Sequence, residues 1–368
     1  MTEISKVPVS DFDAAVRLLS GGTNVAIYND LGLPSVYVRK DKGTLGDLGF
    51  NSNKEKIHPA FIVNGVEVPA FYMGKYLATV YKGRALSLPM QVPTTAYVSA
   101  SNRGSAISDY VTFDNAKSWC EANGAGFHLS TLPEYAWVAL LAHKNRTLPY
   151  GNTKEGGGAG AAIPADNADN AGDFKTLTGS GPATWNDNWA PDGICDLHGN
   201  VEEFQGGYRT VDGELQIFAN NDAAMQYNQN SDSTLWKAIL SDGSLVAPGT
   251  DGSLHWRETF YDAVKKLGIT SELPPAEITE KAVGTLYKDL GYLGTVPGLL
   301  YQLALLPNGY YDTFGNDKIA IVNSGEVLYS RGGCYYTGDY GGVFAMRDTK
   351  RQTYGNSRGF RPAFIPGI

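Results

Sequence analysis

The sequence RGGCYYTGDYGGVFAMRDTKRQTYGNSRGFR, residues 331–361, is the most informative stretch of the chain. Glycines and apolar residues recur through it and alternate with tyrosine, aspartate, threonine, arginine, glutamine and asparagine. Rigid positions that carry aromatic and adaptable polar side chains are typical of a binding surface. A solvated terminal hairpin would show the same alternation, so both interpretations stay open at this point. The recurring set, which we call the frame, is Gly332, Gly333, Gly342, Val343, Phe344, Ala345, Gly359, Phe360 and Arg361.

Length and composition predict a globular protein. The 368 residues are 42% apolar, which is enough for a large core in one domain with insertions or in two domains. No run of about 18 apolar residues predicts a membrane span. Residues 1–13, MTEISKVPVSDFD, lack the basic start and apolar core of a signal peptide. We therefore expect cytoplasmic synthesis without export by the general secretory route.

Charge and cysteine usage exclude two further classes. The net charge of −8 argues against nucleic-acid binding, which requires a positive field to neutralise phosphates. Cys120, Cys195 and Cys334 lie far apart and form no CxxC pair, so the sequence predicts neither a disulfide framework nor a zinc knuckle. We expect three free, buried thiols.

The chain is rich in glycine and tyrosine and carries few charges, which predicts many loops and little helix. Two helices are nevertheless expected, at 113–123 with a spaced apolar face and at 131–144 with a threonine cap and an early proline. We expect both to pack on a sheet. Short β-branched or aromatic runs predict strands at 25–28, 35–39, 60–63, 71–77, 215–218, 319–322 and 327–330.

Two regions differ from the rest. Residues 151–181 are rich in glycine, alanine and asparagine without periodicity, which predicts a long loop. Residues 259–267, 275–286 and 299–306 have helical patterns. These three segments predict an inserted helical subdomain.

Four ordered blocks carry a resemblance to a known family. They read DYVTFDNAKSWC at 109–120, GFHLSTLPEYAW at 126–137, GICDLHGNVEEF at 193–204, and RGG at 331–333 with GFR at 359–361. In this order they resemble the formylglycine-generating-enzyme type of C-type lectin fold, and DLHGNV at 196–201 is the most specific part. The resemblance implies an α+β, C-type lectin-like domain at 56–368 with an insertion at about 209–318, preceded by a β-rich segment at 1–55.

Within that family the chain more closely resembles the variable proteins of diversity-generating retroelements, including phage tropism determinants. Those proteins end in a segment with a Gly-Gly start, a Gly-Val-Phe-Ala centre and a Gly-Phe-Arg finish, as residues 331–361 do here. In them a reverse transcriptase errs at template adenines, so that AAC codons become a broad set of codons without a stop. Lys350 and Gln352 do not arise from AAC. The positions that fit the set are Tyr335, Tyr336, Thr337, Asp339, Tyr340, Arg347, Asp348, Tyr354, Asn356 and Ser357.

The resemblance also raises the hypothesis of an enzyme. Formylglycine generation uses a pair of C-terminal cysteines that hold copper, and this chain has only Cys334 there. The related sulfoxide-synthase branch needs clustered histidines for iron, but the five histidines of this chain lie singly. Glu202 and Glu203 are adjacent and are not expected to face each other. We therefore predict no catalytic residues and no enzyme activity.

A metal or sugar site is the remaining alternative. Asp187, Asp192, Asp196 and Asn200 could supply oxygens to a structural calcium ion, although their spacing is not diagnostic. Trp185 and Trp189 fit core or loop-anchor roles better than a carbohydrate platform. We predict no metal site and no cofactor, with structural calcium left open.

Together these patterns predict a ligand-binding, receptor-binding protein that displays a diversified surface at residues 331–361. Tyr335, Tyr336, Tyr340 and Tyr354 are the expected anchors, because buried aromatic side chains dominate binding energy at interfaces. The expected partner is a protein or surface glycan, such as a host-cell receptor. The expected location of the chain is the tail of a phage virion, where several copies of the chain would bind together. The alternatives are an enzyme of the same superfamily and a structural tail component.

Overall fold

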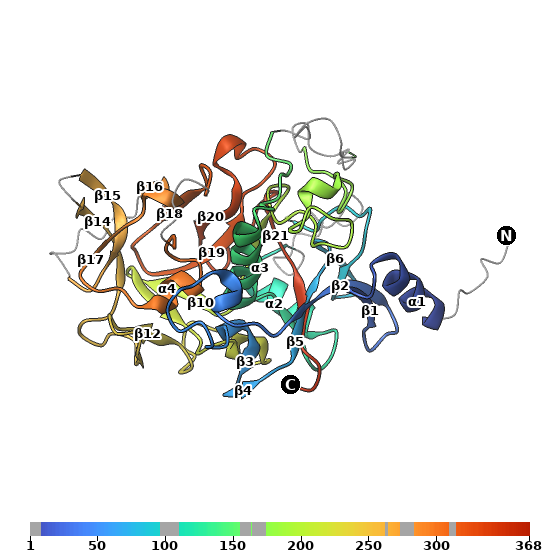
Figure 1. Cartoon of the computed structure of the whole chain (residues 1–368), viewed down its shortest axis with the longest axis horizontal. Coiled ribbons are helices and arrows are strands. Elements are labelled where there is room, and N and C mark those ends of the chain that lie inside the picture. Colours follow the sequence, from blue (N-terminus) through green and yellow to red (C-terminus); the bar gives the residue numbers. More distant parts are fainter. Residues whose placement is uncertain are drawn as a thin grey trace.

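The computed structural model describes residues 9–95, 110–154, 163, 174–261, 264–272, 283–308 and 314–368 (Figure 1). Side chains are described at all of these except residues 9–10, 259–261, 264–266 and 283. Helices and strands are both present, as expected of an α+β protein. No helix within the described residues combines the length and the apolar character needed to cross a membrane.

A five-stranded antiparallel sheet joins the two ends of the described chain. Its order is β1-β2-β5-β22-β8. The last strand, β22, therefore lies between β5 and β8, and strands from both sides of position 55 share one sheet. The bounds are β1 Asn24–Tyr28, β2 Pro34–Asp41, β5 Ala70–Gly74, β8 Phe127–Leu129 and β22 Pro362–Phe364.

A second, larger sheet holds most of the other strands. Its main path is β16-β18-β20-β19-β10-β11-β14-β15-β17, while β9 bridges β19 and β21. The bounds are β9 Glu202–Phe204, β10 Tyr208–Val211, β11 Glu214–Ile217, β12 Lys237–Ile239, β13 Leu245–Val246, β14 His255–Tyr261, β15 Val264–Thr270, β16 Val283–Leu286, β17 Gly291–Leu293, β18 Lys318–Ile321, β19 Glu326–Gly332, β20 Gly342–Thr349 and β21 Arg358–Phe360. Two short hairpins complete the strands, β3 Ile62–Val63 with β4 Val66–Glu67 and β6 Ala78–Tyr81 with β7 Arg84–Ser87.

Both predicted helices are confirmed. Helix α2 spans Phe113–Glu121 and α3 spans Leu132–Asn145. Thr131 caps α3 in a capping box with Glu134, since each side chain accepts a hydrogen bond from the backbone N–H of the other residue. Helix α3 runs through the middle of the molecule (Figure 1), and its apolar side chains share one core with Phe71 of β5 and Phe344 of β20.

The expected inserted helical subdomain is not confirmed. Residues 255–261 and 264–270 form the antiparallel pair β14 and β15, and residues 283–286 form strand β16. Leu267 and Ile269 are both buried at a spacing of two residues, which suits a strand that pairs with β14 and β17. Among the described residues of the three segments, only the third is partly helical, as the short helix α4, Gly298–Gln302. Residues 275–282 of the second segment lie outside the described residues.

Most predicted strands are confirmed at 25–28, 35–39, 215–218, 319–322 and 327–330, each within two residues at either end. The strand expected at 71–77 ends at Gly74, and the run 60–63 begins as a 3₁₀ turn. The sequence analysis missed the first helix, α1 Val9–Leu19, which lies beside β1. Within the loop expected at 151–181, the described residues contain no helix or strand.

A buried ion pair joins the two sheets. The Arg361 side chain is fully buried between β21 and β22, and its Nε and Nη2 donate to the two carboxylate oxygens of Glu203 at 2.8 Å each. The same guanidinium donates to the carbonyls of Gly74, at the end of β5, and of Cys195, at 2.9 Å each. The planar guanidinium therefore holds four acceptors from three separate parts of the chain.

We predict that Arg361→Met lowers the free energy of unfolding by about 3–5 kcal/mol, because it leaves the Glu203 carboxylate buried without its counter-charge. Denaturant unfolding measures this change. The matched control is the double variant Arg361→Met with Glu203→Leu, which should be more stable than Arg361→Met alone. A loss below about 1 kcal/mol in the single variant would contradict a structural role for the pair.

Candidate functional site

Residues 331–361 run through β19, β20 and β21, with a turn before β20 that contains the 3₁₀ helix η9, Gly338–Tyr340. All nine frame residues are buried. Gly332 and Gly333 have φ of +94° and +74°, a region that disfavours other residues, and a Cβ on Gly332 would lie 2.8 Å from the Leu197 carbonyl oxygen. The frame is therefore fixed by packing and by backbone geometry.

A pocket of about 260 Å³ lies over this frame, and we call it the Tyr336 pocket. Strands β18, β19 and β20 supply its floor, β9 supplies a carboxylate, and the turn before β20 supplies its aromatic wall. Four residues expected from the sequence to bind ligand, Tyr336, Thr337, Tyr340 and Arg347, line this one pocket. The other lining residues are Glu202, Lys318, Ala320, Ser330, Gly333, Ala345 and Met346.

Glu202 is the buried charge of the Tyr336 pocket. Its carboxylate accepts hydrogen bonds from Ser330 Oγ at 3.0 Å and from Arg347 Nη1 at 3.2 Å. The negative charge of Glu202 raises the pKa of Arg347. Arg347 also donates to the Tyr336 hydroxyl at 3.3 Å, and that hydroxyl donates to Ser357 Oγ at 3.1 Å. A polar chain thus leads from the buried carboxylate to the exposed tyrosine.

The rim of the pocket is aromatic and basic. Lys318 Nζ lies 5.6 Å from the centre of the Tyr340 ring, a cation–π distance, and both residues are exposed. Met346 and Ala345 add apolar surface beneath them. The pocket can therefore take an apolar group while Arg347, Lys318 and the tyrosine hydroxyls offer hydrogen bonds.

Two of the expected ligand-binding residues are not at the surface. Tyr335 is 7% exposed and packs edge-on against Tyr336, which is 48% exposed, with ring centres 5.0 Å apart. Ser357 is also buried and accepts the Tyr336 hydrogen bond. The expectation that Tyr335 is an exposed anchor is wrong, because the chain turns after Cys334 and directs this side chain inward. Both residues support the pocket from below.

The remaining expected residues lie outside the Tyr336 pocket. Asp339 pairs with Lys154 at 2.8 Å beside a separate hollow. Asp348 lines a different groove, with Lys350. Tyr354 stacks on Tyr110 with ring centres 4.4 Å apart, and Asn356 is half-buried in the turn before β21. The structure therefore gathers four of the ten residues around one pocket and spreads the others along the segment.

Glu202 and Lys318 are the charged pocket residues that sequence reasoning did not assign. Glu202 and Glu203 were considered as a pair, but successive residues of a strand point to opposite faces. Glu202 accordingly binds Arg347, while Glu203 binds Arg361. The strand character of residues 202–204 was the signal that could have separated them. No local sequence pattern marked Lys318 as a site residue, because the parallel pairing of β18 with β20 brings it to the pocket.

The three cysteines are free and buried, as expected. Burial and, secondarily, the charge of Glu202 raise the pKa of Cys334 to about 11. Burial raises the pKa of Cys195 to about 12. These thiols therefore stay protonated at neutral pH, whereas the nucleophilic and metal-binding form is the thiolate.

The side-chain oxygens that could have bound calcium accept hydrogen bonds from other groups of the protein. Asp187 accepts from Lys40 Nζ at 2.6 Å, Asp192 accepts from Thr23 at 3.0 Å, and Asp196 accepts from the Gly179 N–H at 2.8 Å. Asn200 binds the backbone of Thr176 on both sides of its amide. Among the described residues no group of three or more histidine, cysteine and acidic side chains could hold a metal ion. Asp187, Asp192, Asp196 and Asn200 therefore stabilise contacts between segments of the chain.

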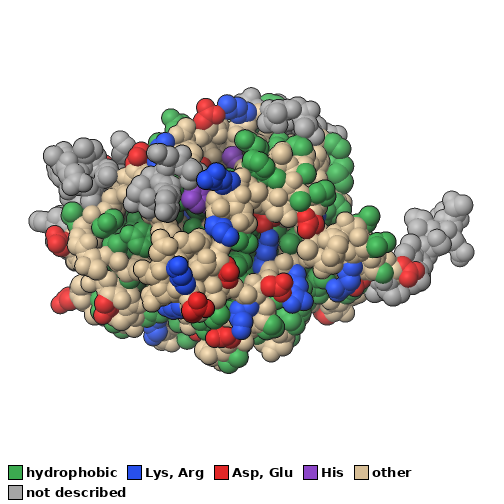
Figure 2. Space-filling model, viewed as in Figure 1, with side chains coloured by type: hydrophobic (Ala, Val, Ile, Leu, Met, Phe, Trp, Pro, Cys, Tyr) green, Lys and Arg blue, Asp and Glu red, His purple; other side chains and the backbone are tan. Residues whose placement is uncertain are grey.

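The surface charge is mixed. On the face in Figure 2, Lys and Arg side chains are interspersed with Asp and Glu instead of forming one basic patch. The chain as a whole carries a net charge of −8. This pattern gives phosphate backbones no extended positive surface on that face.

Comparison with solved structures finds distant likenesses. Treponema denticola variable protein 1 is 12% identical with a TM-score of 0.35, over 93% of this chain and 99% of that chain. The Major Tropism Determinant U1 variant is 12% identical with a TM-score of 0.35, over 93% of this chain and 72% of that chain. These are the kinds of protein that the sequence resembles. PvdO from Pseudomonas aeruginosa is 13% identical with a TM-score of 0.34, over 90% of this chain and 95% of that chain.

No family model matches the sequence, and no curated protein matches it.

Asp196, the first residue of the DLHGNV block, generates a pH prediction. Burial raises its pKa to about 6, above the usual value of 3.8. The native state therefore holds a proton that the unfolded chain releases, so stability falls as the pH rises from about 4 to 6. We predict that Asp196→Asn removes this part of the pH dependence, at most about 3 kcal/mol, because asparagine keeps an acceptor for Gly179 and tolerates the φ of +59°. Urea unfolding at pH 4, 5, 6 and 7 measures it, and parallel curves for the two proteins would contradict the prediction.

Proposed function

We propose that this chain is a ligand-binding, receptor-binding protein with a C-type lectin-like fold of the formylglycine-generating-enzyme type, and that residues 331–361 display its contact surface. One observation carries the proposal: Tyr336, Thr337, Tyr340 and Arg347 converge on one pocket, while the frame residues between them are buried. A rigid frame under exposed aromatic and arginine side chains is the arrangement found at binding hot spots.

We further propose that the exposed positions of this surface are diversified. Tyr336, Tyr340 and Tyr354 are exposed large side chains, and Asp339 and Arg347 are exposed polar ones. Exchanges at exposed positions change stability little, except at Arg347, which neutralises the buried Glu202 carboxylate. Many different sequences can therefore share one scaffold. Tyr335 and Ser357 fit this scheme less well, because a change at either would reach the packed interior.

The proposed partner is a protein or a surface glycan on a host cell, and the proposed location is the virion of a phage or prophage-encoded particle. Display of several copies would multiply weak contacts, since a second binding event becomes intramolecular. A catalytic role is disfavoured because the one cysteine of residues 331–361, Cys334, is buried with its pKa raised to about 11.

Sequencing of the genomic locus tests diversification. We expect a reverse-transcriptase gene and an adenine-rich near-copy of the codons for residues 331–361 close to this gene. Copies of the gene from one population should differ at the codons of exposed positions such as Tyr336 and Tyr340 and agree at the frame codons. A locus without either element, or substitutions spread evenly along the gene, would show that the surface is not diversified.

Stability measurements test the separation of frame from surface. We predict that the triple variant Tyr336→Ser, Tyr340→Ser and Tyr354→Ser lowers the free energy of unfolding by about 0.5 kcal/mol per site. Loss of the hydrogen bonds of the Tyr336 hydroxyl should lower it by about 1 kcal/mol more. Phe344→Ala should cost about 3–5 kcal/mol, because this ring is fully buried against Tyr287 and Phe314.

Thermal and urea unfolding of purified protein give both values, with Tyr81→Ser as a matched control at an exposed tyrosine outside the segment. If the triple variant unfolds while Phe344→Ala stays folded, the tyrosines belong to the core and the proposed surface is wrong.

A further inference from the structure

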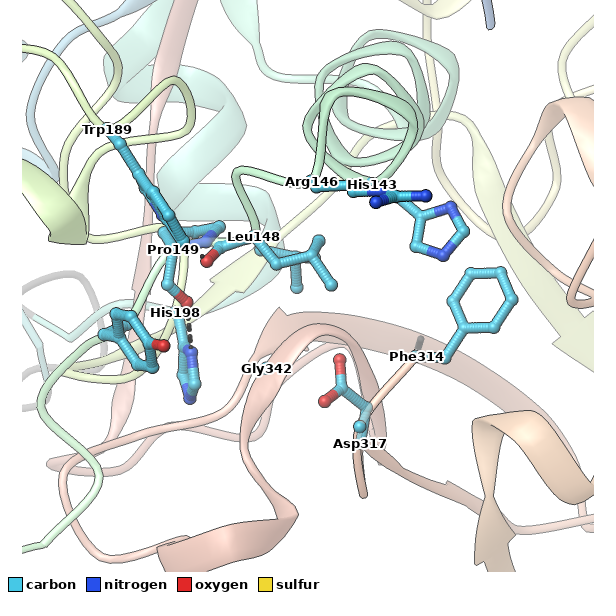
Figure 3. Close-up of a pocket in the computed structure, with 12 residues that line it drawn as sticks. His143, Arg146, Leu148, Pro149, Trp189, His198, Phe314, Asp317 and Gly342 are labelled. Carbon is cyan, nitrogen blue, oxygen red and sulfur yellow. Dashed lines mark hydrogen bonds between the residues drawn. The ribbon is translucent and has the colours of Figure 1, made fainter. Parts of the chain in front are cut away.

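A second cavity, of about 390 Å³, shares no lining residue with the Tyr336 pocket, and we call it the His198 cavity. It lies between the end of α3, the loops that carry Trp189 and His198, and the start of β20 (Figure 3). A hollow of about 680 Å³ adjoins it, since both are lined by Tyr150, His198, Gly315 and Asp317.

The walls of the His198 cavity are mainly apolar and aromatic. Leu148, Pro149 and Val343 supply aliphatic surface. Tyr150 and Trp189 stack with ring centres 6.0 Å apart, yet they remain 59% and 41% exposed. Large aromatic side chains that stay open to solvent beside a cavity are typical of ligand contact.

The Trp189 ring is held in place by its surroundings. Its Nε1 donates to the Leu148 carbonyl at 3.0 Å. The residue has a φ of +56°, which is unusual for a tryptophan and costs free energy. The aromatic wall is therefore a fixed feature of the cavity.

His198 contributes a hydrogen-bond acceptor. Its Nδ1 lies 2.7 Å from the Pro149 carbonyl oxygen, and because a carbonyl only accepts, Nδ1 carries the proton. Burial lowers the pKa of His198, so the ring is neutral. Nε2 is then an acceptor, and within the described residues it has neither a hydrogen-bond partner nor contact with solvent.

Asp317 contributes a carboxylate, which points into the cavity in Figure 3. It is buried, and one oxygen accepts a hydrogen bond from the Phe344 N–H at 2.8 Å. Arg146 lines the same cavity, but its guanidinium forms no ion pair in the part of the chain that the structure describes. Burial raises the pKa of Asp317 to about 7, and a bound cation would favour its charged form. The cavity thus offers two acceptors, Asp317 and His198 Nε2, and one cation, Arg146, between apolar and aromatic walls.

We propose that the His198 cavity binds a primary ammonium group carried on an apolar stem. An ammonium ion supplies three donors and no acceptor, which matches the two acceptors of the cavity. The aromatic faces of Tyr150 and Trp189 attract a cation, and the aliphatic walls accept the stem. An anion would meet the buried Asp317 carboxylate, whereas the exposed Arg146 guanidinium is the charged donor that the cavity offers to a sugar hydroxyl. The ammonium group comes from a free amine or from a lysine side chain of a partner.

Isothermal titration with the full chain tests the proposal. The probes are butylamine and Nα-acetyl-lysine methylamide, and the matched controls are Nα-acetyl-norleucine methylamide, which keeps the stem without the charge, and methyl glucoside. We expect both ammonium probes to bind at least about tenfold more tightly than either control, the ratio that one ion pair or cation–π contact supplies. Tighter binding of the lysine probe than of butylamine indicates a partner lysine, and the reverse indicates a free amine. Norleucine or glucoside binding equal to that of the ammonium probes, or no binding of either ammonium probe, would overturn the proposal.

Variants assign the binding to this cavity. Asp317→Asn keeps an acceptor for Phe344 and should weaken ammonium binding at least about tenfold, whereas Arg146→Gln should strengthen it by removing a like charge. Tyr150→Leu should weaken binding severalfold. Arg146 and Tyr150 are exposed, so their variants should fold. They test whether the ammonium group binds in this cavity even if Asp317→Asn does not fold. Tyr336→Ser, in the other pocket, should leave binding unchanged, and equal affinities across all four variants would place the ammonium group elsewhere.

Discussion

The buried pair of Arg361 with Glu203 is the interaction on which the rest of this structure depends. It lies where the chain passes from β21 of the large sheet to β22 of the small one, and its remaining hydrogen bonds reach the end of β5 and the loop at Cys195. A guanidinium with four well-placed acceptors tolerates complete burial, whereas either partner alone would be an uncompensated charge. The frame at residues 331–361 therefore has a fixed position relative to the core around α3.

Glu202, the residue next to Glu203 in β9, stabilises the contact surface. Strand β9 directs Glu203 toward Arg361 and Glu202 toward Arg347, because successive side chains of a strand point to opposite faces. One short strand thus anchors the frame and also holds the polar chain that orders Tyr336. This arrangement gives an exposed tyrosine a defined orientation, which lowers the conformational entropy that binding would otherwise cost.

The surface and the frame are separated by geometry, not by residue type. Tyr335 and Tyr336 are identical and adjacent, but the first packs inward and the second faces solvent. The His198 cavity is built from loops and the start of β20, and its acceptors and aromatic rings are set by contacts outside the Tyr336 pocket. The fold thus supports two cavities with different residues: the Tyr336 pocket presents Arg347, Lys318 and tyrosine hydroxyls, whereas the His198 cavity presents Asp317 and His198 beside Arg146.

The sequence by itself determined the features that depend on local patterns. The threonine cap and early proline at 131–133, the apolar spacing at 113–123 and the glycines of the frame predicted helices and a rigid segment that the structure contains, because neighbouring residues fix these conformations. Only the tertiary structure decided the rest. Residues 255–261 and 264–270 form strands and not a helix because β11 and β17 pair with them. Lys318 and Glu202 reach the Tyr336 pocket through strand pairings between residues distant in sequence. Long-range hydrogen bonding overrides local propensity at such positions, and no local pattern carries that information.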